Sequence, residues 1–583
     1  MSELASMLLL QTFPIPMAVK KHRRNGSLAF FAVTLTLYGA SAASRAQTVP
    51  PLPPDAGQVL RDLQQAPPVA PPQSAPLQRI EESAEASQNL AKVFIQSIAI
   101  TGNQEVSTAE LQPLIAGLVG SERTFSQLSA AARRITAYYR SKGFAVARAY
   151  LPAQDITDGK VTIAVIEGRI ASHRVNNQSL LSDERAHAYL DRIKDGDVIK
   201  SEQIDRGLLL LQDTPGVSIS RATLQPGASP GTSELLIDIQ PAAPYNGNIV
   251  LDNYGSRYTG EYRLAGTFNL ASPLRIGDQL GFSALTSGDE LQFGRIAYQL
   301  PVGSNGLRLG AAYFDIRYKL GKEFADLHAH GTASSGTIYA AYPFIRSQLK
   351  NLNGTISFED KRLNDYVDAT STATAKKVQT TSLGLSGNLQ DALAGGGINS
   401  FDLSLALGNL KIQSPTALAI DAASAQTDGR YSKLIWSASR LQRFTNATFL
   451  SMSIIGQQAS KNLDSSEKFS LGGPTAVRAY PIAEAPGDEG YLATLELRHN
   501  LMPRVQGVLF YDFGSVTINK TPFGAAAANS RTLSGAGLGL NASLDRVQLK
   551  ASLAWRTSAD LPTSIPVSAA RSPVFWLQAA VAL

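Results

Sequence analysis

The chain has 583 residues, 44% of them apolar, with a mean hydropathy of −0.05, and this balance excludes both a disordered chain and a bundle of membrane-spanning helices. It contains no cysteine, which excludes disulfides, thiol catalysis and cysteine metal sites. The formal net charge is +6, but residues 1–46 hold five Lys/Arg against one Glu, a surplus of four that leaves +2 on the rest and gives no reason to expect a nucleic-acid partner.

The amino terminus has the pattern of a secretion signal. The basic run 20–24 is followed by the apolar run 28–37 and then by small residues that end at Ala46. The apolar run is too short for a membrane anchor. We therefore predict a signal peptide over residues 1–46, cleaved before Gln47, with Met17 as an alternative start.

Residues 47–92 are predicted to form a proline-rich linker. Nine prolines between positions 50 and 76 hold much of it extended. Between them, residues 55–65 can form a short helix with Asp55 as N-cap and with Val59, Leu60 and Leu63 together on one side. Two interpretations stay open, a solvated linker and a helix that docks elsewhere in the protein as a plug.

Residues 93–168 and 169–243 read as two similar small α+β modules with the order strand, helix, helix, strand, strand. The predicted elements are 93–100, 108–118, 126–142, 145–151 and 160–167 in the first module, and 172–175, 183–193, 201–212, 217–225 and 233–240 in the second. Such a module offers a sheet edge to which an extended chain can add as a strand. The alternative is a spacer with no binding role.

Residues 244–583 form a series of runs, each about ten residues long, in which apolar and polar residues alternate with a period of two. In the run from Tyr262 to Leu270, aromatic and aliphatic residues alternate with Arg263 and other polar residues, and the run from Val547 to Arg556 does the same. Inward charges at this density are tolerable only in a wet lumen. Counting such runs gives sixteen, an even number, so we predict a 16-stranded antiparallel transmembrane β-barrel with an aqueous lumen.

Taken in this order, the segments resemble the outer-membrane transporters of two-partner secretion, which export haemagglutinins and haemolysins and carry periplasmic POTRA modules. The resemblance covers essentially all of the chain after the signal. Several short stretches carry it, namely Pro54–Gln58, Gln212–Val217, Gly231–Leu235, Leu251–Asn253 and Tyr298–Gly303. Each stretch is weak alone, and their common order is specific.

Two motifs of that family can be carried over to this sequence. Its lumenal loop motif, Val-Arg-Gly-Tyr, falls on Val477, Arg478, Ala479 and Tyr480, with alanine in place of glycine. Its strand motif, Phe-x-Asp-x-Gly, falls on Phe510, Asp512 and Gly514, which share one parity and face the lumen if their neighbours face lipid. A loop arginine and an inward aspartate can meet only if the loop folds into the lumen, where pairing removes the cost of a lone buried charge. These seven residues are the candidate transport site.

The resemblance implies an outer-membrane protein of a Gram-negative bacterium, with POTRA modules in the periplasm. They would recognise an unfolded, large, β-helical exoprotein, an adhesin or haemolysin, by strand addition, and the barrel would secrete it. Outer-membrane lipid and the barrel-assembly machinery are the other expected partners, although Leu583 stands where barrel proteins commonly end in an aromatic residue. The alternative is a barrel-assembly or insertase factor of the same superfamily, which usually has more modules and no proline-rich helix. A passive porin would not need the modules.

The sequence gives no sign of an enzyme or a cofactor site. Nucleophile-elbow, phosphate-loop and His-Glu-x-x-His motifs are absent. Among six histidines only His328 and His330 lie close in sequence, and two histidines make an incomplete metal site. We predict transport without catalysis, cofactor or metal.

Overall fold

The computed structural model describes residues 53–64, 78–79, 92–156, 158–524 and 528–583. The predicted signal peptide, residues 1–46, lies outside these residues, as does most of the predicted linker. Within the described part of the chain, no helix is long and apolar enough to cross a membrane.

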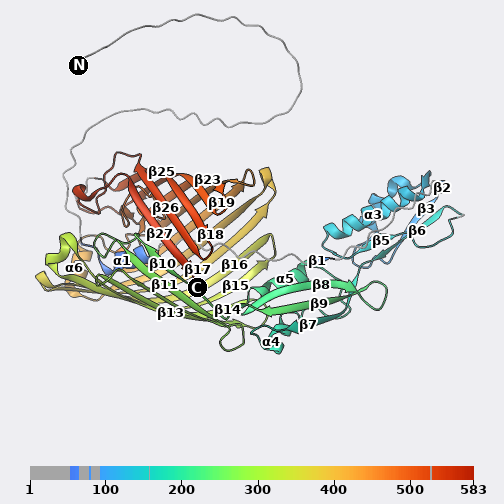
Figure 1. The fold of residues 1–583 in the computed structure, drawn as a ribbon, viewed down its shortest axis with the longest axis horizontal. Coiled ribbons are helices and arrows are strands. Elements are labelled where there is room, and N and C mark those ends of the chain that lie inside the picture. The colour runs from blue at the N-terminus through green and yellow to red at the C-terminus, as the bar shows by residue number, and fades with distance from the viewer. Residues whose placement is uncertain (1–52, 65–77, 80–91, 157, 525–527) are drawn as a thin grey trace, which may run out of the picture. The chain divides into compact units, whose positions relative to one another are not determined.

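Sixteen antiparallel strands close into one barrel, as predicted (Figure 1). Each strand pairs with the next along the chain, and β10 closes the wall against β27 from Asn248↔Ala582 to Asp252↔Gln578. The strands are β10 (Tyr245–Asp252), β11 (Arg263–Ala271), β12 (Gln279–Thr286), β13 (Leu291–Val302), β14 (Leu307–Lys319), β15 (Ala329–Arg346), β16 (Lys350–Val367), β17 (Thr372–Asp391), β18 (Gly397–Ile412), β19 (Gly429–Arg443), β20 (Thr448–Ala459), β23 (Glu489–Met502), β24 (Val505–Thr517), β25 (Ser530–Leu544), β26 (Val547–Arg556) and β27 (Val574–Ala582).

The alternation along each strand separates an apolar outer face from a polar lumen. Leu264 and Leu509 are half-exposed on the outer face, where lipid would cover them. Arg263 lies on the opposite face of β11, and its Nε donates to Asp252 Oδ1 at 2.8 Å. Period-two patterning thus places the charges of the wall inside the barrel.

The first module is built from β2 (Lys92–Ile95), β3 (Ser97–Thr101), α2 (Thr108–Leu111), β4 (Ser121–Thr124), α3 (Phe125–Ser141), β5 (Arg148–Tyr150) and β6 (Lys160–Ile166). The single strand predicted over 93–100 is wrong, because the chain breaks at Gln96, β2 pairs with β4 and β3 pairs with β6. The helix predicted over 108–118 ends at Leu111 and continues as 3₁₀ turns, the first of which has Pro113 near its start. Proline lacks the N–H that would continue an α-helix.

The second module is built from β7 (Arg169–Asn177), α4 (Asp183–Ala188), α5 (Ser201–Gln212), β8 (Val217–Pro226) and β9 (Thr232–Pro241). Helix α4 is shorter than predicted, because the chain after Ala188 closes i→i+3 turns at Leu190 and Ile193. Its sheet has the order β1-β8-β9-β7, where β1 (Gln78–Arg79) is a segment of the linker that pairs in parallel with the edge of β8.

Helix α1 (Ala56–Gln64) lies inside the barrel. The buried side chains of Ala56, Val59 and Leu60 pack in one apolar cluster with inward residues of the wall, among them Ile316 and Leu363. Of the two interpretations left open for this segment, the structure shows the docked helix. Its apolar side, recognisable in the sequence, is covered by the lumenal surface of the strands.

Candidate functional site

The segment between β20 and β23, residues 460–488, folds back into the lumen, and we call it the lumen loop. Its only regular elements are the 3₁₀ turn Ser465–Glu467 and the short pair β21 (Phe469–Ser470) and β22 (Pro486–Gly487). Ion pairs join it to inward residues of β16, β17, β19, β23, β24 and β25. The loop is therefore fastened to much of the circumference of the wall.

Arg478 of the lumen loop meets Asp512 of β24 in a bidentate pair. Arg478 Nε donates to Asp512 Oδ2 at 2.8 Å, Nη2 donates to Oδ1 at 2.7 Å, and the backbone N–H of Arg478 donates to Oδ2 at 3.1 Å. The Asp512 side chain is fully buried. A carboxylate buried this deeply needs a paired cation, and the planar guanidinium fits both of its oxygens.

Three further contacts fix the arginine. Its Nη1 donates to Glu496 Oε1 at 2.7 Å, and Glu496 also pairs with Arg498. The guanidinium lies 3.4 Å from the centre of the Phe510 ring, a cation–π contact. The indole N–H of Trp576 donates to the Arg478 carbonyl at 2.8 Å. Two arginines and two carboxylates thus form a charge-balanced cluster.

The flanking motif residues close the turn that presents Arg478 and tie it to the connection between β26 and β27. Val477 N–H donates to Leu471 O at 2.7 Å, which closes the turn that presents Arg478. Tyr480 is buried, and its hydroxyl donates to Asp560 O at 2.7 Å. The backbone φ of Ala479 is not positive, so alanine carries no backbone strain at the position where the family motif has glycine. Its methyl faces Gly535, where a Cβ would lie 2.5 Å from it.

Gly514 is required by close approach rather than by its backbone angle. A Cβ at this position would lie 2.5 Å from Leu471 Cδ2 in the lumen loop. A side chain on Gly514 would therefore force the Leu471 side chain to move and would crowd the Tyr491 carbonyl, 3.0 Å from the same Cβ. The structure brings all seven motif residues together at one place on the wall.

An acidic turn of the lumen loop forms a second cluster that the sequence analysis did not identify. Glu467 lies 2.9 Å from Lys361 of β16 and 2.9 Å from Lys433 of β19, and Asp464 lies 2.7 Å from Lys376 of β17. Burial opposes the ionisation of Glu467, but the two lysines outweigh it and lower its pKa to about 2. Strand alternation predicts that these lysines face inward, but it cannot predict which acid they meet.

Helix α1 rests on this acidic turn. Its N-cap Asp55 accepts from Ser465 Oγ at 2.7 Å and lies 3.2 Å from Lys376 Nζ, and Arg61 Nη1 donates to Ser465 O at 2.9 Å. The N–H of Ala56 donates to Asp365 of β16 at 2.7 Å. The helix is thus held at its N-terminus by Asp365 and Lys376 of the wall and along one side by the loop.

One acid of the helix is poorly satisfied. The Asp62 side chain is 11% exposed and 3.6 Å from Arg61, and its Oδ1 accepts no hydrogen bond from any described residue. Burial, only partly offset by Arg61, raises the pKa of Asp62 from 3.8 to about 6. The docked helix therefore favours the protonated acid.

The two neighbouring histidines do not belong to this site. His328 ends a turn before β15, and His330 stacks on Tyr366 and lies 3.4 Å from Asp368. Among the described residues, no three His, Asp or Glu side chains are placed to hold a metal ion.

Comparisons with known proteins agree with this architecture. Residues 231–542 match the family described as haemolysin secretion/activation protein ShlB/FhaC/HecB, and residues 93–168 match the POTRA domain, ShlB-type. The chain is 31% identical to the heme/hemopexin transporter protein HuxB of Haemophilus influenzae over 84% of this chain and 88% of that protein. It is 24% identical to the hemolysin transporter protein HpmB of Proteus mirabilis over 68% of this chain and 70% of that protein. The solved structure of CdiB from Escherichia coli has the same fold, with a TM-score of 0.68 and 21% identity over 91% of this chain and 96% of that one.

Proposed function

This chain belongs to the family of haemolysin secretion and activation proteins, and from that premise we propose that it captures an unfolded exoprotein with its periplasmic modules and passes it through a lumen that helix α1 closes at rest. The family's proteins are outer-membrane transporters that secrete exoproteins, with their POTRA domains in the periplasm. The alternative of a barrel-assembly factor is not favoured, because the matched family and the relatives are secretion proteins.

The observation that carries the proposal is the way in which the lumen is filled. Helix α1 occupies part of it through hydrogen bonds, an ion pair and apolar contacts, and it is not a strand of the wall. It can therefore leave without breaking the barrel, whereas the lumen loop is continuous with β20 and β23 and also bonds to the wall through its backbone, as from the Ser460 N–H to the Ser432 carbonyl. The lumen is lined by charged and amide side chains, which can form hydrogen bonds with the polar backbone of an extended polypeptide as it passes.

Capture would use the edges of the module sheets. In the first module β3 and β5 are the two edge strands of a three-stranded sheet, and an extended client can add to such an edge by backbone hydrogen bonds. The cargo would be a large β-helical adhesin or haemolysin, and its folding outside would prevent return. We propose that the chain itself performs no catalysis, needs no cofactor, and relies on the barrel-assembly machinery for insertion and on lipid around its apolar wall.

Deleting residues 93–168 tests this proposal. The deletion should abolish export of the secreted exoprotein partner of this chain and leave a heat-modifiable barrel in the outer membrane. Heat-modifiable migration on a gel reports the folded barrel, and the amount of cargo in the medium reports export. Export that persists at the wild-type level from the truncated chain would refute capture by this module.

A further inference from the structure

The outer face of the barrel carries a row of cations whose mutual repulsion is unfavourable unless an anion binds there. Arg362 of β16 pairs directly with Lys377 of β17, and Lys377 pairs directly with Lys411 of β18. Arg362 and Lys377 face outward because their sequence neighbours Lys361 and Lys376 face the lumen. Lys411 faces outward as well, because its neighbours Leu410 and Ile412 are buried in the lumenal cluster. Side chains directly opposite each other on neighbouring strands lie about 5 Å apart at Cβ, and like charges there are destabilising.

Acids on the same face do not neutralise this row. Asp360 lies 2.9 Å from Lys377 and 3.9 Å from Arg362, and it is the one carboxylate paired with them among the described residues. Lys411 is exposed and has no acidic partner within the described part of the chain. Arg430 of β19, which pairs in register with Asn409, extends the exposed cations by one strand. Four cations outnumber the acids Asp360 and Asp428, whose Oδ1 accepts from the N–H of Ile412 next to Lys411, so the patch is net positive.

The row lies next to the apolar band of the wall. Two residues further toward the middle of each strand, the same outer face carries Asp360, Gln379 and Asn409. Two residues beyond these it carries Phe358, Thr381 and Leu407. Since the POTRA modules are periplasmic and precede β10, alternate strands place this end of β16, β17 and β18 on the external side of the membrane. The patch therefore sits where the headgroups of the outer leaflet begin.

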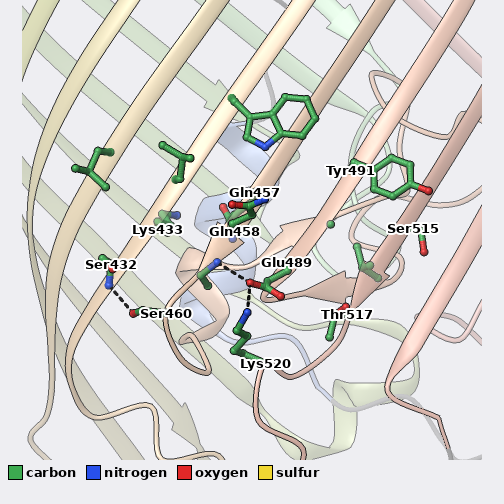
Figure 2. Close-up of a pocket in the computed structure, with 16 residues that line it drawn as sticks. Ser432, Lys433, Gln457, Gln458, Ser460, Glu489, Tyr491, Ser515, Thr517 and Lys520 are labelled. Carbon is green, nitrogen blue, oxygen red and sulfur yellow. Dashed lines mark hydrogen bonds and ion pairs between the residues drawn. The ribbon is translucent and has the colours of Figure 1, made fainter.

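A pocket of about 640 Å³ adjoins the patch on the outer wall over β19, β20, β23 and β24 (Figure 2). Ser432, two residues after Arg430 on the same face of β19, lies at one side of it, and its N–H donates to Ser460 Oγ at 2.9 Å. Trp436 and Tyr491 supply aromatic surface to the pocket, and Lys520 is paired with Glu489 at 2.6 Å. The pocket thus offers hydroxyls and an aromatic floor with no net charge.

We propose that this patch binds the phosphate groups of a phosphorylated glycolipid in the outer leaflet, with the sugar hydroxyls at the adjoining pocket. Phosphate oxygens form charge-assisted hydrogen bonds with arginine and lysine, and one phosphate can bridge two cations of neighbouring strands. Acyl chains would continue along the apolar band. The inference rests on the outer-membrane location and is independent of cargo export.

Native mass spectrometry of the full-length protein in detergent tests the proposal. The probes are bisphosphorylated lipid A, the same lipid A without phosphates, and phosphatidylglycerol. We expect the wild type to prefer the first probe, and the triple variant Arg362→Gln, Lys377→Gln, Lys411→Gln to bind it on the order of tenfold more weakly, which corresponds to about 1.4 kcal/mol. The control is Arg275→Gln, Lys350→Gln, Arg546→Gln, which removes the same charge from exposed positions at the periplasmic end and should bind like the wild type.

Three results would overturn the proposal, namely equal binding by the triple variant, equal binding of the dephosphorylated lipid, or equal binding of phosphatidylglycerol. Heat-modifiable migration checks that each variant is folded. If the triple variant does not fold, the pair Lys411→Gln and Arg430→Gln provides the same comparison, because both side chains are exposed and unpaired by any described acid. Unchanged lipid A binding by that pair would equally refute the site.

Discussion

Gly57 of helix α1 lies so close to Ser465 of the lumen loop that a Cβ on residue 57 would be 2.4 Å from the Ser465 Oγ. The backbone N of Ser466 would lie 2.7 Å from the same Cβ, so a side chain cannot be accommodated by a rotamer change alone. The helix can rest on the loop only because this residue is glycine.

We expect Gly57→Val to release the helix. Overpacking costs about 1–3 kcal/mol, which corresponds to a docking constant reduced roughly 5- to 150-fold. Single-channel recordings in planar bilayers should show higher conductance, approaching that of a chain lacking residues 48–77. Gly336→Val on β15 is the control, because a Cβ there meets no atom within 4 Å. Unchanged conductance in both Gly57→Val and the deletion would mean that the helix does not close the pore.

Arg478→Ala and Asp512→Ala should each abolish export. Arg478→Ala leaves the buried Asp512 without a cation, and Asp512→Ala leaves Arg478 with Glu496 alone, a cost on the order of 3–5 kcal/mol at the buried limit and less where a partner remains or water enters. Arg478→Lys keeps the charge but loses the bidentate geometry, so it should recover only part of the function. The exchange of Arg478→Asp with Asp512→Arg restores the Coulomb attraction and should recover some export.

The amount of folded barrel must be measured beside the exported cargo, because a lost brace can act through assembly. Glu496 gives an internal comparison: it accepts one hydrogen bond from Arg478 whereas Asp512 accepts three, so Glu496→Gln should be milder than Asp512→Asn. Wild-type export from equally abundant barrels of both single alanine variants would show that the pair has no role in transport.

Docking of helix α1 should weaken as pH rises from 4 to 6. The pKa of Asp62 is raised from 3.8 to about 6 by burial, so the docked helix holds a proton that the free helix has lost. Docking is therefore strongest below pH 4 and weakens by at most about tenfold per pH unit until pH 6. Wild-type conductance should be higher at pH 7.5 than at pH 5, and Asp62→Asn should remove this difference. If Asp62→Asn shows the same conductance difference between the two pH values, another titrating group causes it.

Glu467→Gln should loosen the lumen loop. It leaves Lys433, whose side chain is 11% exposed, without a charged partner, and it leaves Lys361, 4% exposed, with only Glu359 at 3.7 Å, at a cost of about 3–5 kcal/mol at the buried limit. Hydrogen exchange over residues 460–488 should accelerate, and adding Lys361→Met should reverse part of the effect. Glu489→Gln is the control, because its partner Lys520 is 41% exposed and such pairs contribute about 0–1 kcal/mol. Equal exchange in both variants would contradict a structural role for Glu467.

The sequence predicts the wall well because alternation is a local signal. Every second residue of a strand faces lipid, so the strands and the inward direction of Asp512 follow from nearest neighbours. The break at Gln96 was not predictable, because it depends on which strands pair across the module. The partner of Lys361 and Lys433 could not be predicted for the same reason. Glu467 is 106 residues from Lys361 and 34 residues from Lys433 along the chain.

The sharing of Lys376 between Asp55 of the helix and Asp464 of the loop has a consequence for the order of events in the pore. When the helix departs, Lys376 still has Asp464, and Asp365 still accepts from Tyr318. Departure of the loop would instead strand Asp512 and Lys433. We therefore expect the helix to leave the pore reversibly, because its exit leaves Lys376 and Asp365 each with a partner, and we expect the loop to stay in place while the cargo passes.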